Sequence, residues 1–147
     1  MKSFLISLSQ LIFSLLMYVM GTVYFGLALA PGIAITLKTW QATALLEPFA
    51  RYVLLGFSIA GGYFLFGFSL ILLAGLTRTL LGLRLKEGKY PLFSWTAIQW
   101  AFVSSLYLMI NFTFIDFILL TPFANILFRL LGAKLGKNVQ INSKFVF

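Results

Sequence analysis

The C-terminal stretch from Thr121 to Phe147 reads TPFANILFRLLGAKLGKNVQINSKFVF, and its first part predicts a short amphipathic helix over residues 122–132. Thr121 suits the N-cap of this helix, Pro122 its first position, and Gly132 the position just past its end. Apolar residues recur there at intervals of three and four, as they do on one side of a surface helix. The side chains that we expect to be buried together are Phe123, Ile126, Leu127, Leu130 and Leu131.

The second part of the stretch has a different period. Leu135, Ile141 and Phe147 are six residues apart, and the small residue Gly136 follows the first of them. An aliphatic residue followed by a small one at this spacing is typical of a left-handed parallel β-helix, whose coils must stack to bury their apolar column. We therefore expect residues 133–147 to be the first, incomplete coil of such a β-helix, cut off after about two sides.

The composition indicates a membrane protein. Hydrophobic residues make up 61% of the 147 positions and charged residues 10%, against roughly 45–50% and 25% in soluble domains. The length allows at most one domain. The net charge of +8 comes from basic residues that flank apolar stretches, so it predicts contact with the anionic headgroups of a lipid bilayer and no binding of nucleic acid.

The chain contains no Cys and no His. This composition excludes disulfides, thiol chemistry, the usual structural zinc sites and a histidine general base within the chain. We therefore predict no metal site and no catalytic residue, and the sequence identifies no cofactor-binding residue.

Two apolar stretches are long enough to cross a bilayer, and we place the spans at about residues 4–29 and 52–76. No charge occurs between residues 3 and 37, which is more than the roughly 20 residues that a spanning helix needs. Pro31 and Gly32 should break or kink the first helix. The segment 33–37, which is too short to cross again, would then lie at the interface.

Both spans contain small residues four positions apart. Such pairs let two helices approach closely, although glycine is also simply common in membrane helices, and both interpretations stay open. The pairs are Gly56 with Ala60 and Ser58 with Gly62 in the second span, and Gly26 with Ala30 as a possible opposing face in the first.

Two polar segments separate the apolar stretches. Residues 38–51 form a link with Trp40 as an interfacial anchor, and Glu47 followed by a proline marks a turn or a helix start. Residues 77–96 form the main polar loop, where basic residues adjoin aromatic ones, as expected at a membrane surface. These aromatic residues are Tyr90, Trp95 and Trp100.

Residues 97–120 form a third apolar stretch, whose path follows from the distribution of Lys and Arg. If it crosses the bilayer, five basic residues lie on one side of the membrane and six on the other. If it dips in and returns, nine basic residues lie on one side and two on the other. The second distribution obeys the positive-inside rule. We therefore favour two spans plus a re-entrant or interfacial third helix, with both termini cytoplasmic, over three full spans.

These elements together predict an all-α integral membrane fold with the start of a β-helix at its C-terminus. Residues 1–121 would form the membrane helical domain, 122–132 the amphipathic helix and 133–147 the incomplete coil. Asp116 lies inside the third apolar stretch, and an ionisable residue at membrane depth is a functional candidate by default. Alternatively, Asp116 lies near the interface and pairs with Arg129.

A family resemblance depends on three runs of the sequence. They are residues 88–95, GKYPLFSW, then Thr121-Pro122-Phe123, and then residues 129–139, RLLGAKLGKNV. They resemble the membrane-embedded C-terminal modules of nonribosomal-peptide-synthetase-like polymerases, which make poly-amino acids, and are similar to bacterial membrane acyltransferases of the hexapeptide-repeat type. In that family a G-x-Y-P loop and an R-L-L-G-A helix exit lead into a left-handed β-helix. The positions of this chain that match are Tyr90, Pro91, Gly132 and Gly136, and the resemblance covers roughly residues 86–147.

The resemblance implies acyl or aminoacyl transfer by a whole protein in the bacterial cytoplasmic membrane, with coenzyme A or a carrier-bound thioester as donor. The family's transfer site lies on later coils and usually includes a histidine, so no catalytic residue is carried over to this chain. We expect a non-catalytic N-terminal fragment, with no cofactor of its own, that serves as the membrane anchor of a missing β-helix domain or a partner chain. The alternative is a small non-enzymatic membrane protein such as an anchor, an assembly subunit or a transporter component.

Overall fold

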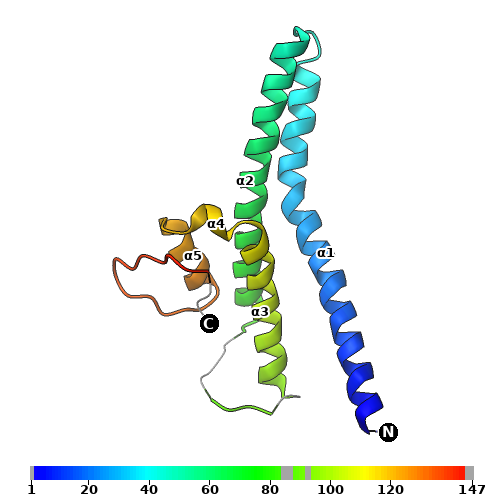
Figure 1. Cartoon of the computed structure of the whole chain (residues 1–147), viewed down its shortest axis with the longest axis vertical. Helices are drawn as coiled ribbons and strands as arrows, with labels where there is room; N and C mark the ends of the chain where they lie inside the picture. Colours follow the sequence, from blue (N-terminus) through cyan, green and yellow to red (C-terminus); the bar gives the residue numbers. More distant parts are fainter. Residues whose placement is uncertain (1, 84–87, 92–93, 145–147) are drawn as a thin grey trace.

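The structure, a computed structural model, describes residues 2–83, 88–91 and 94–144, and helices make up 77% of them (Figure 1). The helices are α1 (Lys2–Ala42), α2 (Pro48–Leu80), α3 (Trp95–Thr113), α4 (Ile115–Ile118) and α5 (Pro122–Leu130). Helices α1 and α2 form a long antiparallel hairpin. The shorter helices α3, α4 and α5 pack against the C-terminal half of α2, so the molecule has one long arm and one compact unit at its side.

The α1–α2 hairpin turns at residues 43–47. The Glu47 carboxylate accepts hydrogen bonds from the backbone N–H groups of Phe49 (3.1 Å) and Ala50 (3.2 Å), and Pro48 occupies the first turn of α2. A carboxylate at this position satisfies donors that the helix leaves unpaired and stabilises the positive end of its dipole. The predicted helix start at Glu47 is therefore confirmed.

The predicted break at Pro31 is wrong, because α1 runs through it to Ala42. The proline removes one backbone hydrogen bond, but the residues around it pack against α2. Ala28 is fully buried, and the Gly32 backbone lies directly against that of Gly62. This packing extends the first helix well past residue 29 and shortens the link from the predicted 38–51 to 43–47.

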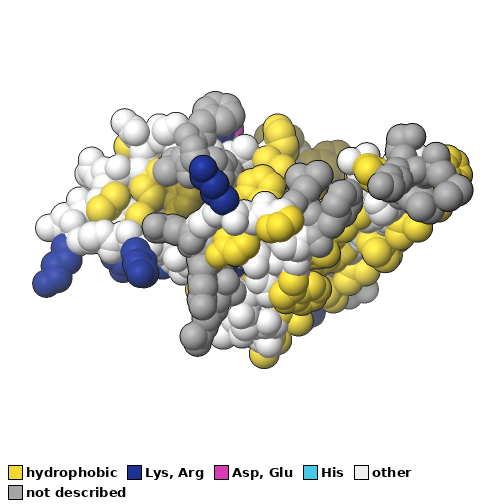
Figure 2. Space-filling model, turned by 90° about the horizontal axis from the view of Figure 1, so that it is seen from below, with side chains coloured by type: hydrophobic (Ala, Val, Ile, Leu, Met, Phe, Trp, Pro, Cys, Tyr) yellow, Lys and Arg dark blue, Asp and Glu magenta, His cyan; other side chains and the backbone are white. Residues whose placement is uncertain are grey.

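Two helical segments, Ile6–Ala42 and Pro48–Leu80, are long and apolar enough to cross a membrane. Large hydrophobic side chains on both are exposed, among them Leu16 at 59% and Phe57 at 73%. Figure 2 shows hydrophobic side chains along the side of α1, whereas several Lys and Arg side chains lie toward α5. In a soluble protein such faces would be covered by other parts of the chain.

The third apolar stretch does not form one helix over residues 97–120. Helix α3 ends at Thr113 beside Tyr63, halfway along α2, where the Tyr63 hydroxyl donates a hydrogen bond to the Thr113 carbonyl. The chain turns through α4, and α5 then runs along α2 toward its C-terminal end. The ring of Phe123 lies 4.9 Å from that of Phe68, and the Leu130 side chain lies against Gly75. The third stretch thus reverses direction beside α2.

The core lies where α2, α3, α4 and α5 meet. The Phe114 ring covers Gly67 of α2 so closely that a Cβ atom on this glycine would lie 2.2 Å from ring carbons. Other fully buried side chains surround this contact, and their burial holds the three short helices to α2. They are Leu70, Leu106, Tyr107, Ile110, Ile115, Ile118 and Leu127.

The predicted β-helix start is wrong: the described residues after α5, 131–144, contain no strand. They fold back over α5 instead. The Leu120 N–H donates to the Ile141 carbonyl (3.0 Å), and Asn125 donates to the Val139 carbonyl (2.7 Å). Leu135 and Ile141 do face inward, but onto the helical core, which offers an apolar surface where no stacked coil is present. Phe147 lies outside the described residues.

The caps predicted for α5 are confirmed, but the predicted buried stripe is only partly right. Thr121 accepts a hydrogen bond from the Phe123 N–H (3.2 Å), and Gly132 has a φ of +96°. Leu127 is fully buried, whereas Phe123 and Ile126 are 46% and 48% exposed. The buried face is rotated toward Ala124 and Phe128, because α2 and α3 approach α5 from that side.

Candidate functional site

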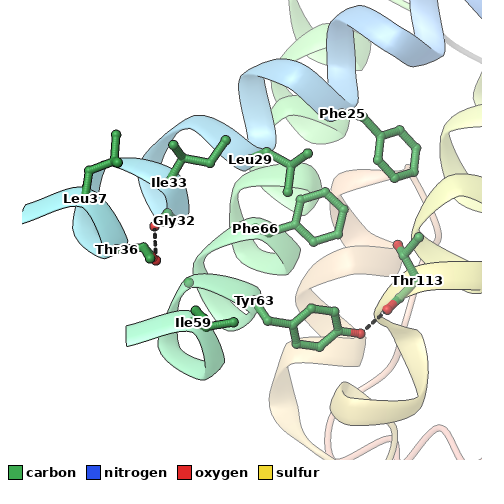
Figure 3. Close-up of a pocket in the computed structure, with 11 residues that line it drawn as sticks. Phe25, Leu29, Gly32, Ile33, Thr36, Leu37, Ile59, Tyr63, Phe66 and Thr113 are labelled. Carbon is green, nitrogen blue, oxygen red and sulfur yellow. Dashed lines mark hydrogen bonds between the residues drawn. The ribbon is translucent and has the colours of Figure 1, made fainter. Parts of the chain in front are cut away.

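An apolar groove of about 620 Å³ lies where the α1–α2 hairpin meets the end of α3 (Figure 3). Ile33 and Leu37 of α1 line one wall, and Ile59 of α2 lines the other. The rings of Phe25 and Phe66, 5.6 Å apart between centroids, lie at the end away from the α1–α2 turn, which is the lower end in the view of Figure 1. We call this space the hairpin groove.

Two glycines form the floor of the hairpin groove. A Cβ atom on Gly32 would lie 2.7 Å from the Gly62 carbonyl oxygen and 3.0 Å from its Cα, so the two backbones touch at this crossing. Because neither glycine has a side chain, the backbones of α1 and α2 can touch at this point, and the larger side chains on either side form the walls of the groove. Gly62 was one candidate contact residue in the sequence, and the structure places it against Gly32 and not against Gly26 or Ala30, the face suggested for the first span. A Cβ atom on Gly26 would meet nothing within 4 Å.

A second groove of about 760 Å³ continues from the first along α1 and α3. The two grooves share Phe25, Leu29 and Thr113. Gly21 and Gly26 line the second groove, and both have open space where a side chain would be. The apolar lining therefore extends down the hairpin on the side of α3.

The hydroxyl groups in the hairpin groove are already hydrogen-bonded within the chain. Thr36 donates to the Gly32 carbonyl (3.0 Å), Thr113 donates to the Met109 carbonyl (2.7 Å), and Tyr63 donates to the Thr113 carbonyl. The lining includes no Asp, Glu, Lys or Arg. Such a site can hold a hydrocarbon group, but it offers no acid, base or nucleophile beyond these bonded hydroxyls.

Among the described residues, no three His, Cys, Asp or Glu side chains come close enough to hold a metal ion. The absence of a metal site stays a prediction from the sequence.

The structure pairs Asp116 with Lys144, so the predicted pairing with Arg129 is wrong. The Lys144 ammonium lies 3.0 Å from both carboxylate oxygens of Asp116. Arg129 instead donates to the Gly136 carbonyl (3.2 Å). The fold of the tail explains both contacts, because residues 131–144 return past α5 to α4. The side chains of the pair are 34% and 62% exposed, so in water it would contribute little to stability.

The other candidate residues also lie away from the hairpin groove. A Cβ atom added to Gly88 would lie 3.3 Å from the Tyr90 ring. The Pro91 carbonyl accepts a hydrogen bond from the Ser94 N–H (3.0 Å) just before α3 begins. Gly132 follows α5 and lies against Arg78 near the C-terminal end of α2. Tyr90, Pro91, Gly132 and Gly136, the positions that carry the resemblance, do not line the hairpin groove.

Sequence reasoning missed Arg78, which joins α2 to the end of α5. Its guanidinium donates to the Leu130 carbonyl (3.3 Å), and a Cβ atom on Gly132 would lie 2.3 Å from one of its nitrogens. An arginine in the last turn of a helix normally interacts with its own helix end or with headgroups. The contact with a second helix depends on how α5 packs, which no local pattern reveals.

Replacing Gly132 with valine should destabilise the compact unit by about 2 kcal/mol or more, because a β-branched residue is strained at positive φ and would displace Arg78. Thermal unfolding in detergent measures the effect. Gly136→Val is the matched control, since its φ is not positive and its Cβ would meet only Val139 at 3.8 Å. Equal unfolding temperatures for the two variants would contradict the assignment.

Comparison of the chain with protein-family models, with curated proteins and with solved structures finds no match. The resemblance to membrane acyltransferases therefore depends on the sequence motifs alone.

Proposed function

We propose that this chain is a non-catalytic integral membrane anchor in which α1 and α2 span a bilayer. The observation that carries the proposal is the pair of long apolar helices, Ile6–Ala42 and Pro48–Leu80, with large hydrophobic side chains exposed along their outer faces. At 33 residues α2 measures about 50 Å, and its uncharged part from residue 52 to 77 exceeds the roughly 30 Å of a hydrocarbon core.

The proposed orientation puts both termini in the cytoplasm of a bacterial cell and the turn at residues 43–47 outside. Lys38 and Arg51 lie near this turn. Arg78 lies in the last turn of α2, Arg129 lies in the last turn of α5, and the remaining described basic residues of the tail follow α5. This arrangement supports the positive-inside assignment. The reversal of the third stretch beside Tyr63 further supports a re-entrant path over a third span.

Cysteine labelling tests this topology, and because the chain has no Cys of its own, any label on it must be on the introduced residue. Leu45, which is fully exposed in the turn, and Lys137, which is exposed in the tail, are each replaced with cysteine. In spheroplasts a membrane-impermeant maleimide should label Leu45→Cys at once and Lys137→Cys only after permeabilisation. Labelling of both residues from outside would mean three spans, and release of the protein by alkaline carbonate would refute the anchor.

A second candidate is the anchor region of a hexapeptide-repeat acyltransferase-like protein, favoured by the runs 88–95 and 129–139. In that case coenzyme A or a carrier-bound thioester would be used by a domain or partner outside this chain. Reading the gene beyond the codon for Phe147 and in its neighbourhood tests this candidate. The absence of any acyltransferase domain there would leave the plain anchor.

A further inference from the structure

We infer that the hairpin groove, together with Arg51 at its upper end, binds one anionic phospholipid from the leaflet at the α1–α2 turn. The inference depends on the proposed membrane location and goes beyond it, because it assigns a specific lipid site. The acyl chain would lie in the groove, and the phosphate would lie at the Arg51 guanidinium.

The dimensions of the groove fit one acyl chain. Its lining on α1 extends from Phe25 to Leu37, which is about 18 Å at 1.5 Å per residue. One leaflet supplies about 15 Å, half of the hydrocarbon core. Because the hydroxyl groups in the groove already donate hydrogen bonds within the protein, the groove does not require a polar ligand, and an acyl chain has no polar groups.

The upper end of the groove carries the charge that a phosphate requires. Trp40 follows Thr36 by one helical turn and therefore lies on the groove side of α1. The Arg51 guanidinium lies 3.6 Å from the centroid of the Trp40 ring and donates one hydrogen bond to the Trp40 carbonyl (3.4 Å). This stacking fixes the guanidinium at the end of the groove and leaves further donors for an oxyanion.

No carboxylate neutralises Arg51 in the described part of the chain. The one ion pair there joins Lys144 and Asp116, far along the chain. Glu47 is the closest acidic residue in sequence, but its carboxylate binds the N–H groups of Phe49 and Ala50. An open apolar groove that has at its end an arginine without a carboxylate partner among the described residues complements a lipid with acyl chains and a negative headgroup.

The test is native mass spectrometry of the purified full chain in detergent, with dioleoyl phosphatidylglycerol or dioleoyl phosphatidylcholine added. The wild-type chain should retain one phosphatidylglycerol, at least tenfold more tightly than phosphatidylcholine. Arg51→Gln should bring the two lipids to within about twofold of each other. Lys38→Gln is the matched control: it removes the same charge near the same turn, but Lys38 lies two residues before Trp40 and hence on the opposite side of α1.

A second pair of variants tests the acyl chain. Ile33→Trp should fill the groove and lower the binding of both lipids at least tenfold, whereas Ile35→Trp should leave it unchanged. Both isoleucines are exposed, at 54% and 43%, but only Ile33 lines the groove. Circular dichroism and gel filtration confirm that each variant is folded, and Arg51→Lys, which keeps the charge, should retain part of the preference if Arg51→Gln unfolds.

Equal binding of the two lipids by the wild-type chain, or an unchanged preference in Arg51→Gln, would overturn the inference. So would a dimer in place of the lipid adduct. None of these results affects the anchor, which fails only if the protein is released from membranes by carbonate.

Discussion

Gly32→Leu is expected to separate α1 from α2 and to lower the free energy of unfolding by more than about 3 kcal/mol, beyond the usual range for overpacked cores. A Cβ atom at this position would lie 2.7 Å, 3.0 Å and 3.1 Å from backbone atoms of Gly62. Backbone atoms cannot rotate away as a side chain can, so the helices must move apart. The contacts on both sides of the crossing would be lost with that movement, including the ring pair of Phe25 and Phe66.

Thermal unfolding in detergent measures this loss, and Gly62→Leu should reproduce it from the other side of the contact. Gly61→Leu is the matched control, because a Cβ atom on this neighbouring glycine would meet nothing within 4 Å. We expect it to unfold within a few degrees of the wild type. If Gly32→Leu unfolds at the temperature of Gly61→Leu, the two helices do not cross at these glycines.

Much of the hairpin could be predicted from sequence, because long uncharged runs have few structural alternatives. Its register could not. The spacing of small residues that made Gly62 a candidate contact residue also suggested Gly26 and Ala30 as the opposing face, and Pro31 was expected to break or kink the first helix. Packing on both sides of Pro31 carries α1 to Ala42, and this places Gly32 at the crossing. Local propensity gives the cost of a proline but not the tertiary contacts that offset it.

The C-terminal tail shows a different limit of sequence reasoning. Inward-facing residues six positions apart occur in a β-helix, but a loop that wraps a helix can bury Leu135 and Ile141 at the same spacing. Only the neighbours decide between these structures, and in this chain the neighbours are helices. The same wrapping carries Lys144 to Asp116, a partner that helical spacing could not suggest.

The groove was invisible in the sequence for a related reason. Its lining comes from three helices and consists of residues that would equally suit a core, and it contains no motif with a characteristic spacing. The one chemical signal was an arginine next to an apolar span. A basic residue at this place is normally interpreted as setting the orientation of the span in the membrane and not as binding a ligand.

Gly67→Ala is the second substitution with a large expected effect, and it should detach the compact unit while leaving the hairpin intact. The added methyl group would lie 2.2 Å from ring carbons of Phe114. This ring joins the end of α3 to α2: its centroid lies 5.8 Å from the ring of Tyr63, 6.0 Å from that of Phe64 and 5.4 Å from that of Phe68. The ring cannot move without losing several of these contacts, so we expect about 3 kcal/mol of destabilisation.

Hydrogen exchange locates the effect. Amides of α3 and α5 should exchange faster in Gly67→Ala, whereas those of α1 and of α2 near Gly32 and Gly62 should keep their protection, because the glycine crossing lies outside the compact unit. Gly56→Ala is the control, since a Cβ atom there meets nothing within 4 Å.

Phe114→Leu, alone and combined with Gly67→Ala, completes a double-mutant cycle. The two changes should be non-additive by about 1–2 kcal/mol, because the smaller side chain leaves room for the methyl group. Additive effects would mean that Phe114 does not rest on Gly67 and that the third stretch is held beside α2 by other contacts.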